Sequence, residues 1–115
     1  MSEPRKRPTL VLACAALAAA LWAGAAAAAD PTAGEAKVKE VCQACHGMDG
    51  NSQAPDYPKL GGQHRDYLAK ALRDYKSGAR KNPIMAGFAA SLSAADIDNV
   101  SAYYAGQPAV LAVKH

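Results

Sequence analysis

Five consecutive residues, Cys42-Gln43-Ala44-Cys45-His46, carry the side chains whose types and spacing could do chemistry in this chain. Two thiols three positions apart lie on one side of a helical turn, so both can form thioether bonds to the vinyl groups of one haem. The imidazole of His46 offers a nitrogen lone pair that can bind the haem iron. The pattern therefore predicts one covalent haem, with thioethers at Cys42 and Cys45 and with His46 as an axial ligand.

Haem attachment of this kind belongs outside the cytoplasm, and the start of the chain has the features of an export signal. Basic residues at 5–7 precede an apolar stretch at 10–23, and small residues at 27–29 form a cleavage signal. We expect residues 1–29 to be a cleaved signal peptide and residues 30–115 to be a haem domain in the periplasm. The alternative is an uncleaved membrane anchor, because the apolar stretch approaches the ~20 residues that a spanning helix needs.

Removal of the signal peptide changes the composition. Three of the 13 basic residues and one of the 10 acidic residues lie within it, which leaves the mature domain with a net charge of +1. That balance gives no basis for nucleic-acid binding. Of the three cysteines, Cys14 is removed, so the two that remain are both in the motif. A domain this short has a marginal core, and a haem can serve as the missing part of it.

The sequence predicts an all-α fold. β-Branched residues are few after residue 29 and never alternate over the length of a strand, so a sheet is not expected. Thr32 and Glu35 have the spacing of a capping box, with Thr as the N-cap and Glu three residues later. They predict a first helix from about residue 33 to residues 42–44, which delivers the cysteines.

Two further helices are expected. The second covers residues 64–77, where apolar side chains recur at helical spacing, and Gly78 is its predicted terminator. The third starts at Ser93, whose capping partner is Asp96, and stops at Gly106. We therefore expect three main helices separated by irregular segments.

The two long connections, residues 47–63 and 79–92, are rich in Gly, Pro, Asn and Asp. Each can wrap one edge or face of a haem. Met85 lies in the second connection, and a thioether sulfur is a soft ligand that favours reduced iron. Met85 is therefore our predicted second axial ligand, although a methionine can also be simple core filler.

Other side chains compete with Met85 less well. Met48 lies two residues from His46, a span of at most about 7 Å, and cannot reach the opposite face of the macrocycle. His64 sits at a predicted helix start among polar residues, where an exposed or capping histidine is the ordinary interpretation. His115 is the last residue of the sequence.

Five stretches of the sequence together resemble a known family, the class I monohaem cytochromes c. They are Cys42–Gly47 followed by Asp49-Gly50-Asn51, then Tyr57–Gln63, Asn82–Met85, and Leu92-Ser93 leading into Ile97 and Ala102-Tyr103-Tyr104. Within that family the chain is similar to the small bacterial type, whose haem domain also occurs in tandem in dihaem cytochromes. The resemblance covers about residues 33–107, and it implies a small cytochrome c fold with short helical turns and long loops wrapped around one haem.

The resemblance also implies roles for individual residues. The carbonyl of Pro58 is expected to accept the Nδ1 proton of His46 and so to fix its tautomer. Leu60, in the same loop, is expected to pack against the haem.

In this family the first and last helices cross near their ends, with a small residue at the point of closest approach. The candidates for that contact are Gly34 or Ala36 on the first helix, against Tyr103 or Tyr104 on the last.

With both axial positions filled by His46 and Met85, oxygen and small substrates have no open site on the iron. The expected function is outer-sphere electron transfer, by a carrier that is not an enzyme, between a membrane quinol-oxidising complex and a terminal oxidase or reductase. One alternative is a haem subunit permanently bound to a periplasmic dehydrogenase. Others are a five-coordinate haem sensor or ligand-binding protein, a haem-free dithiol oxidoreductase, which lacks its usual βαβ pattern here, and a zinc site.

Overall fold

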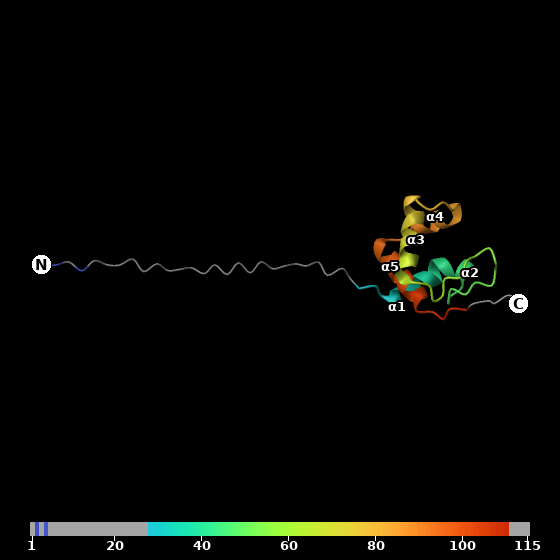
Figure 1. Ribbon diagram of the computed structural model, residues 1–115, viewed down its shortest axis with the longest axis horizontal. Coiled ribbons are helices and arrows are strands. Elements are labelled where there is room, and N and C mark those ends of the chain that lie inside the picture. Colours follow the sequence, from blue (N-terminus) through green and yellow to red (C-terminus); the bar gives the residue numbers. More distant parts are fainter. Residues whose placement is uncertain (1, 3, 5–27, 111–115) are drawn as a thin grey trace.

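The computed structural model describes residues 2, 4 and 28–110, and this part of the chain is helical with no strand (Figure 1). Its elements are α1 (Pro31–Lys37), the π-helix η1 (Val38–Cys42), α2 (Gln43–His46), α3 (Arg65–Ser77), α4 (Pro83–Ala90) and α5 (Ala94–Ala105). The predicted all-α fold class is confirmed. None of the described helices is both long and apolar enough to cross a membrane. Most of the predicted signal peptide, including Cys14, and the terminal His115 lie outside the described residues.

The first helix begins two residues earlier than predicted. Its N-cap is Asp30, whose carboxylate accepts hydrogen bonds from the backbone N–H groups of Thr32 at 2.9 Å and Ala33 at 3.3 Å. The prediction of Thr32 as the N-cap is therefore wrong. Asp30 is the stronger start signal because its charge complements the helix dipole and because Pro31, which follows it, is pre-set for the first helical turn.

The π-helical turn η1, which joins α1 to α2, was not predicted. The backbone N–H of Gln43 bonds to the carbonyl of Val38, five residues earlier. One extra residue in a turn rotates every later side chain about the helix axis by about 100°. Cys45 and His46 are thereby rotated about the helix axis relative to Gly34 and Val38, which face the interior of the domain.

Two of the predicted helices have the predicted ends. α3 stops at Gly78, which takes the left-handed conformation at φ 84°. α5 begins with a complete capping box, because Ser93 Oγ accepts from the Asp96 N–H at 3.0 Å while the Asp96 carboxylate accepts from the Ser93 N–H at 2.9 Å.

α4 was not predicted, because its residues were assigned to an irregular connection. Asn82 caps it by accepting hydrogen bonds from the N–H groups of Ile84 at 3.1 Å and Met85 at 3.0 Å, and Pro83 occupies the first turn. Asn-Pro is a helix-start signal that the Gly- and Pro-rich composition of the segment obscured. Met85 is therefore held on a helix rather than on a loop.

α1 and α5 cross at Gly34, where their backbones touch (Figure 1). A side-chain carbon on Gly34 would lie 2.0 Å from the carbonyl oxygen of Asn99 and 3.1 Å from Cβ of Tyr103. Gly34 is buried whereas Ala36 is exposed, so Gly34 is the residue at the close approach. The main core cluster lies beside this crossing and contains Val38, Leu68, Val100 and Tyr104.

We expect Gly34→Ala to destabilise the protein by at least about 2 kcal/mol, because the backbones must separate to admit a methyl group. Urea unfolding of the protein as purified measures this. The control is Gly87→Ala in α4, where a side-chain carbon would meet no atom within 4 Å. Gly87→Ala should instead stabilise by about 0.5–1 kcal/mol through helix propensity. Equal effects of the two changes would show that the crossing is not tight.

Candidate functional site

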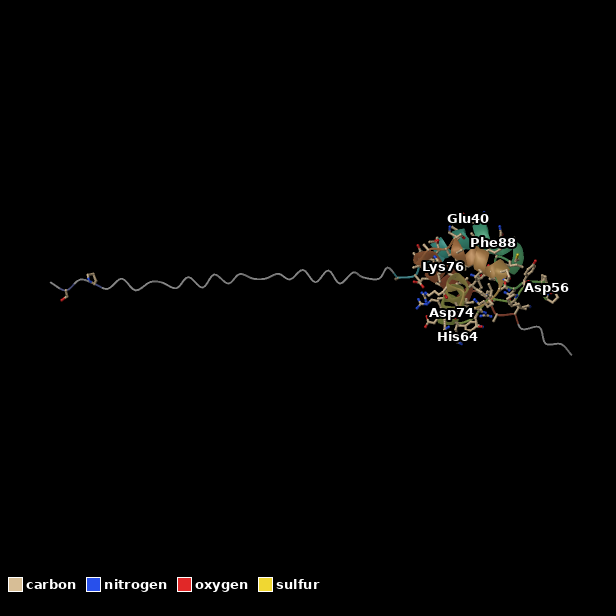
Figure 2. All side chains as sticks on the ribbon, turned by 90° about the horizontal axis from the view of Figure 1, so that it is seen from above. Glu40, Asp56, His64, Asp74, Lys76 and Phe88 are labelled. Carbon is tan, nitrogen blue, oxygen red and sulfur yellow. The ribbon has the colours of Figure 1, made fainter. Side chains whose placement is uncertain are left out.

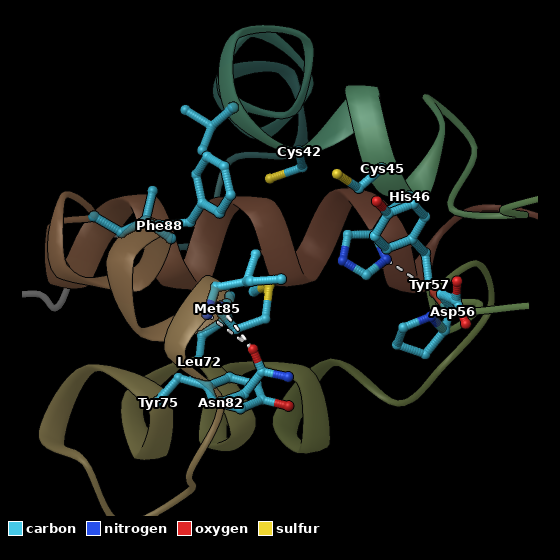
Figure 3. A pocket seen from close by; sticks show the side chains of 14 residues that line it. Cys42, Cys45, His46, Asp56, Tyr57, Leu72, Tyr75, Asn82, Met85 and Phe88 are labelled. Atoms are coloured by element: carbon cyan, nitrogen blue, oxygen red, sulfur yellow. Dashed lines mark hydrogen bonds between the residues drawn. The ribbon is translucent and has the colours of Figure 1, made fainter. Parts of the chain in front are cut away.

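All the predicted site residues line one cavity. It consists of two adjoining hollows that share six lining residues, Cys42, His46, Pro58, Leu72, Tyr75 and Met85. Cys45 lines the first hollow and Leu60 lines the second. Figure 3 shows the two thiols together on one side, with His46 and Met85 on opposite sides of the space next to them.

His46 is held with one nitrogen free. Its side chain is buried, and its Nδ1 lies 2.9 Å from the carbonyl oxygen of Pro58. Because a carbonyl can only accept, Nδ1 must carry the proton and donate it. The lone pair is therefore on Nε2, which is the nitrogen left available to a metal.

The Pro58 carbonyl belongs to a loop that is held in place by hydrogen bonds of Gly50 and Asn51. The carbonyl of Gly50 accepts hydrogen bonds from the N–H groups of Leu60 at 2.7 Å and Gly61 at 3.2 Å. The buried Asn51 side chain donates to the carbonyl of Pro108 at 2.9 Å and accepts from the N–H of Val110 at 3.1 Å. The segment after α5 thus braces the loop that orients His46.

The two cysteines are free thiols in a half-buried position. Burial raises the pKa of the Cys42 thiol to about 11, although the positive charge of Lys37 acts in the opposite direction. A dithiol oxidoreductase depends on a thiol with a lowered pKa, so this site does not favour that alternative. A neutral sulfur such as a thioether suits it better. Residues 28–110 also contain no cluster of three His, Cys, Asp or Glu that could hold zinc.

Met85 faces the cavity, whereas neither Met48 nor His64 lines it. The Met48 side chain packs against the main core cluster. His64 is exposed at the N-cap position of α3, on the outer edge of the molecule in Figure 2. Among the residues that the structure describes, Met85 is therefore the sulfur that is placed opposite His46.

The lining suits a large apolar group that carries a metal. Apolar side chains at its margin are left open to solvent, with 61% of Ile84, 43% of Phe88 and 51% of Tyr67 exposed. Burial of apolar surface is worth about 25 cal/mol per Å², so these side chains indicate a core that the polypeptide alone does not complete. One imidazole nitrogen and one thioether sulfur on opposite sides match the axial donors of a haem iron.

Some residues of the cavity received no individual role from the sequence. Leu72 and Tyr75 belong to the apolar stripe that predicts a helix over residues 64–77. Phe88 follows Met85 by three residues, so both lie on one face of α4. That spacing could have identified Phe88 as a lining residue had the helix start at Asn82 been recognised.

Comparison with known proteins gives consistent matches. Residues 29–103 match the protein family described as cytochrome c oxidase, cbb3-type, subunit III. Cytochrome c4 from Thiocapsa roseopersicina is 49% identical over 79 residues, which are 69% of this chain and 41% of the relative. Cytochrome c-554(548) from Halomonas halodenitrificans is 43% identical over 83 residues, which are 70% of this chain and 99% of the relative.

A solved structure is similar as well. Reduced recombinant cytochrome c4 from Pseudomonas stutzeri aligns with a TM-score of 0.65 and 43% identity, over 70% of this chain and 47% of that one. This chain spans about two fifths of the length of the cytochrome c4 relatives that it matches.

We expect Asn51→Ala to destabilise the protein by about 1–3 kcal/mol, because the change removes the two hydrogen bonds that the buried Asn51 side chain makes to the Pro108 carbonyl and the Val110 N–H. Urea unfolding measures the loss. Gln53→Ala, which removes an exposed amide from the same loop, is the control and should change stability by less than about 0.5 kcal/mol. The bracing role of Asn51 is wrong if the two variants are equally stable.

Proposed function

The chain belongs to the cytochrome c family, and from this premise we propose that it is a periplasmic electron-transfer protein holding one haem. Membership of the family implies a covalently bound haem c. We propose a single haem because one Cys-x-x-Cys-His motif occurs in the sequence. In this proposal Cys42 and Cys45 form the thioethers, His46 and Met85 are the axial ligands, and Leu60 packs against the haem.

The observation that carries the proposal is the opposition of His46 and Met85 across a cavity with both thiols beside it (Figure 3). A haem bound there supplies one-electron chemistry between Fe(III) and Fe(II). His46 and Met85 would hold the iron of such a haem from both sides, which would leave no position on it for a substrate. The carbonyl of Pro58 makes the His46 imidazole more basic, whereas the sulfur of Met85 favours the reduced state.

Two acidic residues of the domain, Asp49 and Asp96, serve local structure. Asp49 accepts a hydrogen bond from the backbone N–H of Asn51 at 2.9 Å, which holds the pKa of its carboxyl below the usual value. Asp96 is held in the same way by the N–H of Ser93. Carboxylates with lowered pKa stay ionised at neutral pH and are poor general acids. Neither carboxylate is assigned a catalytic role, and the proposed electron transfer needs none.

The proposed mature domain begins at Asp30, and this residue makes hydrogen bonds that stabilise the fold. Its backbone N–H donates to Oδ1 of Asn99 at 2.7 Å, and its carboxylate caps α1. A free α-amino group at Asp30 would keep that donor. Cleavage after residue 29 is thus compatible with the fold, and the order of the signal features supports export to the periplasm.

We propose redox proteins as the partners, with a membrane quinol-oxidising complex as the electron donor and a terminal oxidase or reductase as the acceptor. Neither the sequence nor the charge balance supports a nucleic-acid partner. A free carrier should elute alone during gel filtration, whereas a permanent dehydrogenase subunit should co-elute with a larger protein.

Met85→Ala should abolish the weak red absorption band that marks iron–methionine bonding in the oxidised protein. The reduction potential should also fall, because the soft ligand that stabilises Fe(II) is removed. Visible spectroscopy and a redox titration measure both effects. Met48→Leu is the matched control and should leave the band and the potential unchanged. Loss of the band in the control alone would contradict the assignment, and a wild-type protein without the band would favour the five-coordinate sensor.

A further inference from the structure

Tyr104 connects the last helix to both segments that hold His46. It lies in the final turn of α5, only 1% of it is exposed, and it lines the second hollow of the cavity. Its ring belongs to the main core cluster. A buried tyrosine needs a partner for its hydroxyl, and the choice of partner shows what the residue does.

The first connection is to the backbone directly after His46. The Tyr104 hydroxyl donates to the carbonyl of Gly47 at 2.9 Å. Gly47 ends α2 with φ 81° and ψ 159°, a conformation with positive φ that favours glycine. The same carbonyl accepts a longer hydrogen bond of 3.3 Å from the N–H of Gly50. The Tyr104 hydroxyl thus holds the backbone at Gly47, where the chain turns away from His46.

The second connection is to the loop that carries Pro58. The backbone carbonyl of Tyr104 accepts from the N–H of Gly62 at 2.9 Å. The ring packs so closely on Gly50 that a side-chain carbon there would lie 2.8 Å from Cδ1 of Tyr104. The carbonyl of Gly50 in turn accepts hydrogen bonds from the N–H groups of Leu60 and Gly61. The loop that presents the Pro58 carbonyl to Nδ1 of His46 is therefore seated on Tyr104.

The hydroxyl keeps its proton under ordinary conditions. Burial is the main reason that the pKa of Tyr104 is raised, because an ionised phenolate would lose its hydration. Tyr104 is therefore a constant donor toward Gly47.

We propose that Tyr104 is a positioning residue for the axial ligand His46, acting through Gly47 behind the ligand and through the Gly50–Gly62 loop in front of it. The inference rests on the proposed function, in which His46 binds the haem iron. It assigns to Tyr104 a role that is separate from core packing, since the ring alone would serve packing equally well as phenylalanine.

The test is Tyr104→Phe in the haem-containing protein, with Tyr103→Phe as the matched control. Tyr103 is the next residue of α5, but it lies at the crossing with Gly34 rather than against Gly47. In the reduced protein, solvent exchange of the His46 Nδ1 proton should be about tenfold faster in Tyr104→Phe than in the control. The reduction potential should also rise, because a less well aligned Nδ1 hydrogen bond makes the imidazole a weaker donor to Fe(III).

A purely structural role would lower the melting temperature of Tyr104→Phe and leave both of these readouts equal to the control, which would overturn the inference. Should Tyr104→Phe fail to fold, NMR of the reduced wild-type protein decides. The inference predicts a slowly exchanging Tyr104 hydroxyl proton with a nuclear Overhauser contact to the α-protons of Gly47, and the absence of that signal contradicts it. Wild-type protein without His/Met ligation would instead overturn the proposed function itself.

Discussion

The contact between the backbones of Gly34 and Asn99 sets the position of the helix that carries the cysteines. No side chain separates α1 from α5 at this point, so the two helices have a fixed distance and a fixed register. The hydrogen bond from the N–H of Asp30 to the side chain of Asn99 ties the start of α1 to the same turn of α5. At the far end of α5, Tyr104 reaches the residue that follows His46. The helical segment 31–46, which carries the cysteines and His46, is thus hydrogen-bonded to α5 next to both of its ends.

The remaining contacts set the directions in which the side chains of the site point. The π-helical turn rotates the motif relative to the residues that face the core, and the Pro58 carbonyl then selects the tautomer of His46. Met85 comes from the other side on a helix that Asn82 caps. Apolar side chains at the margin of the cavity are exposed, which means that a haem would supply both the chemistry and part of the core.

Local signals predicted well those features that depend on neighbouring residues. The capping box of Ser93 and the terminator Gly78 are where the sequence placed them, since each needs only residues a few positions away. The π-helical turn was not predictable from neighbouring residues. It lets Gly34 and Val38 face the interior of the domain while Cys45 and His46 line the cavity, and both requirements depend on contacts with distant parts of the chain. The hydrogen bond between Tyr104 and Gly47 joins residues 57 positions apart, and no local pattern indicates such a pair. The Pro58 contact was expected from family resemblance rather than from spacing.

The mass of the purified polypeptide under denaturing conditions shows most directly whether the chain itself carries the haem. We predict the mass of residues 30–115 plus one haem, with the colour staying on the polypeptide after extraction with acid acetone. Replacing Cys42 and Cys45 together by alanine should return the mass to that of the polypeptide alone. A wild-type polypeptide with no added haem, or one whose colour passes into the acetone, would contradict the covalent site.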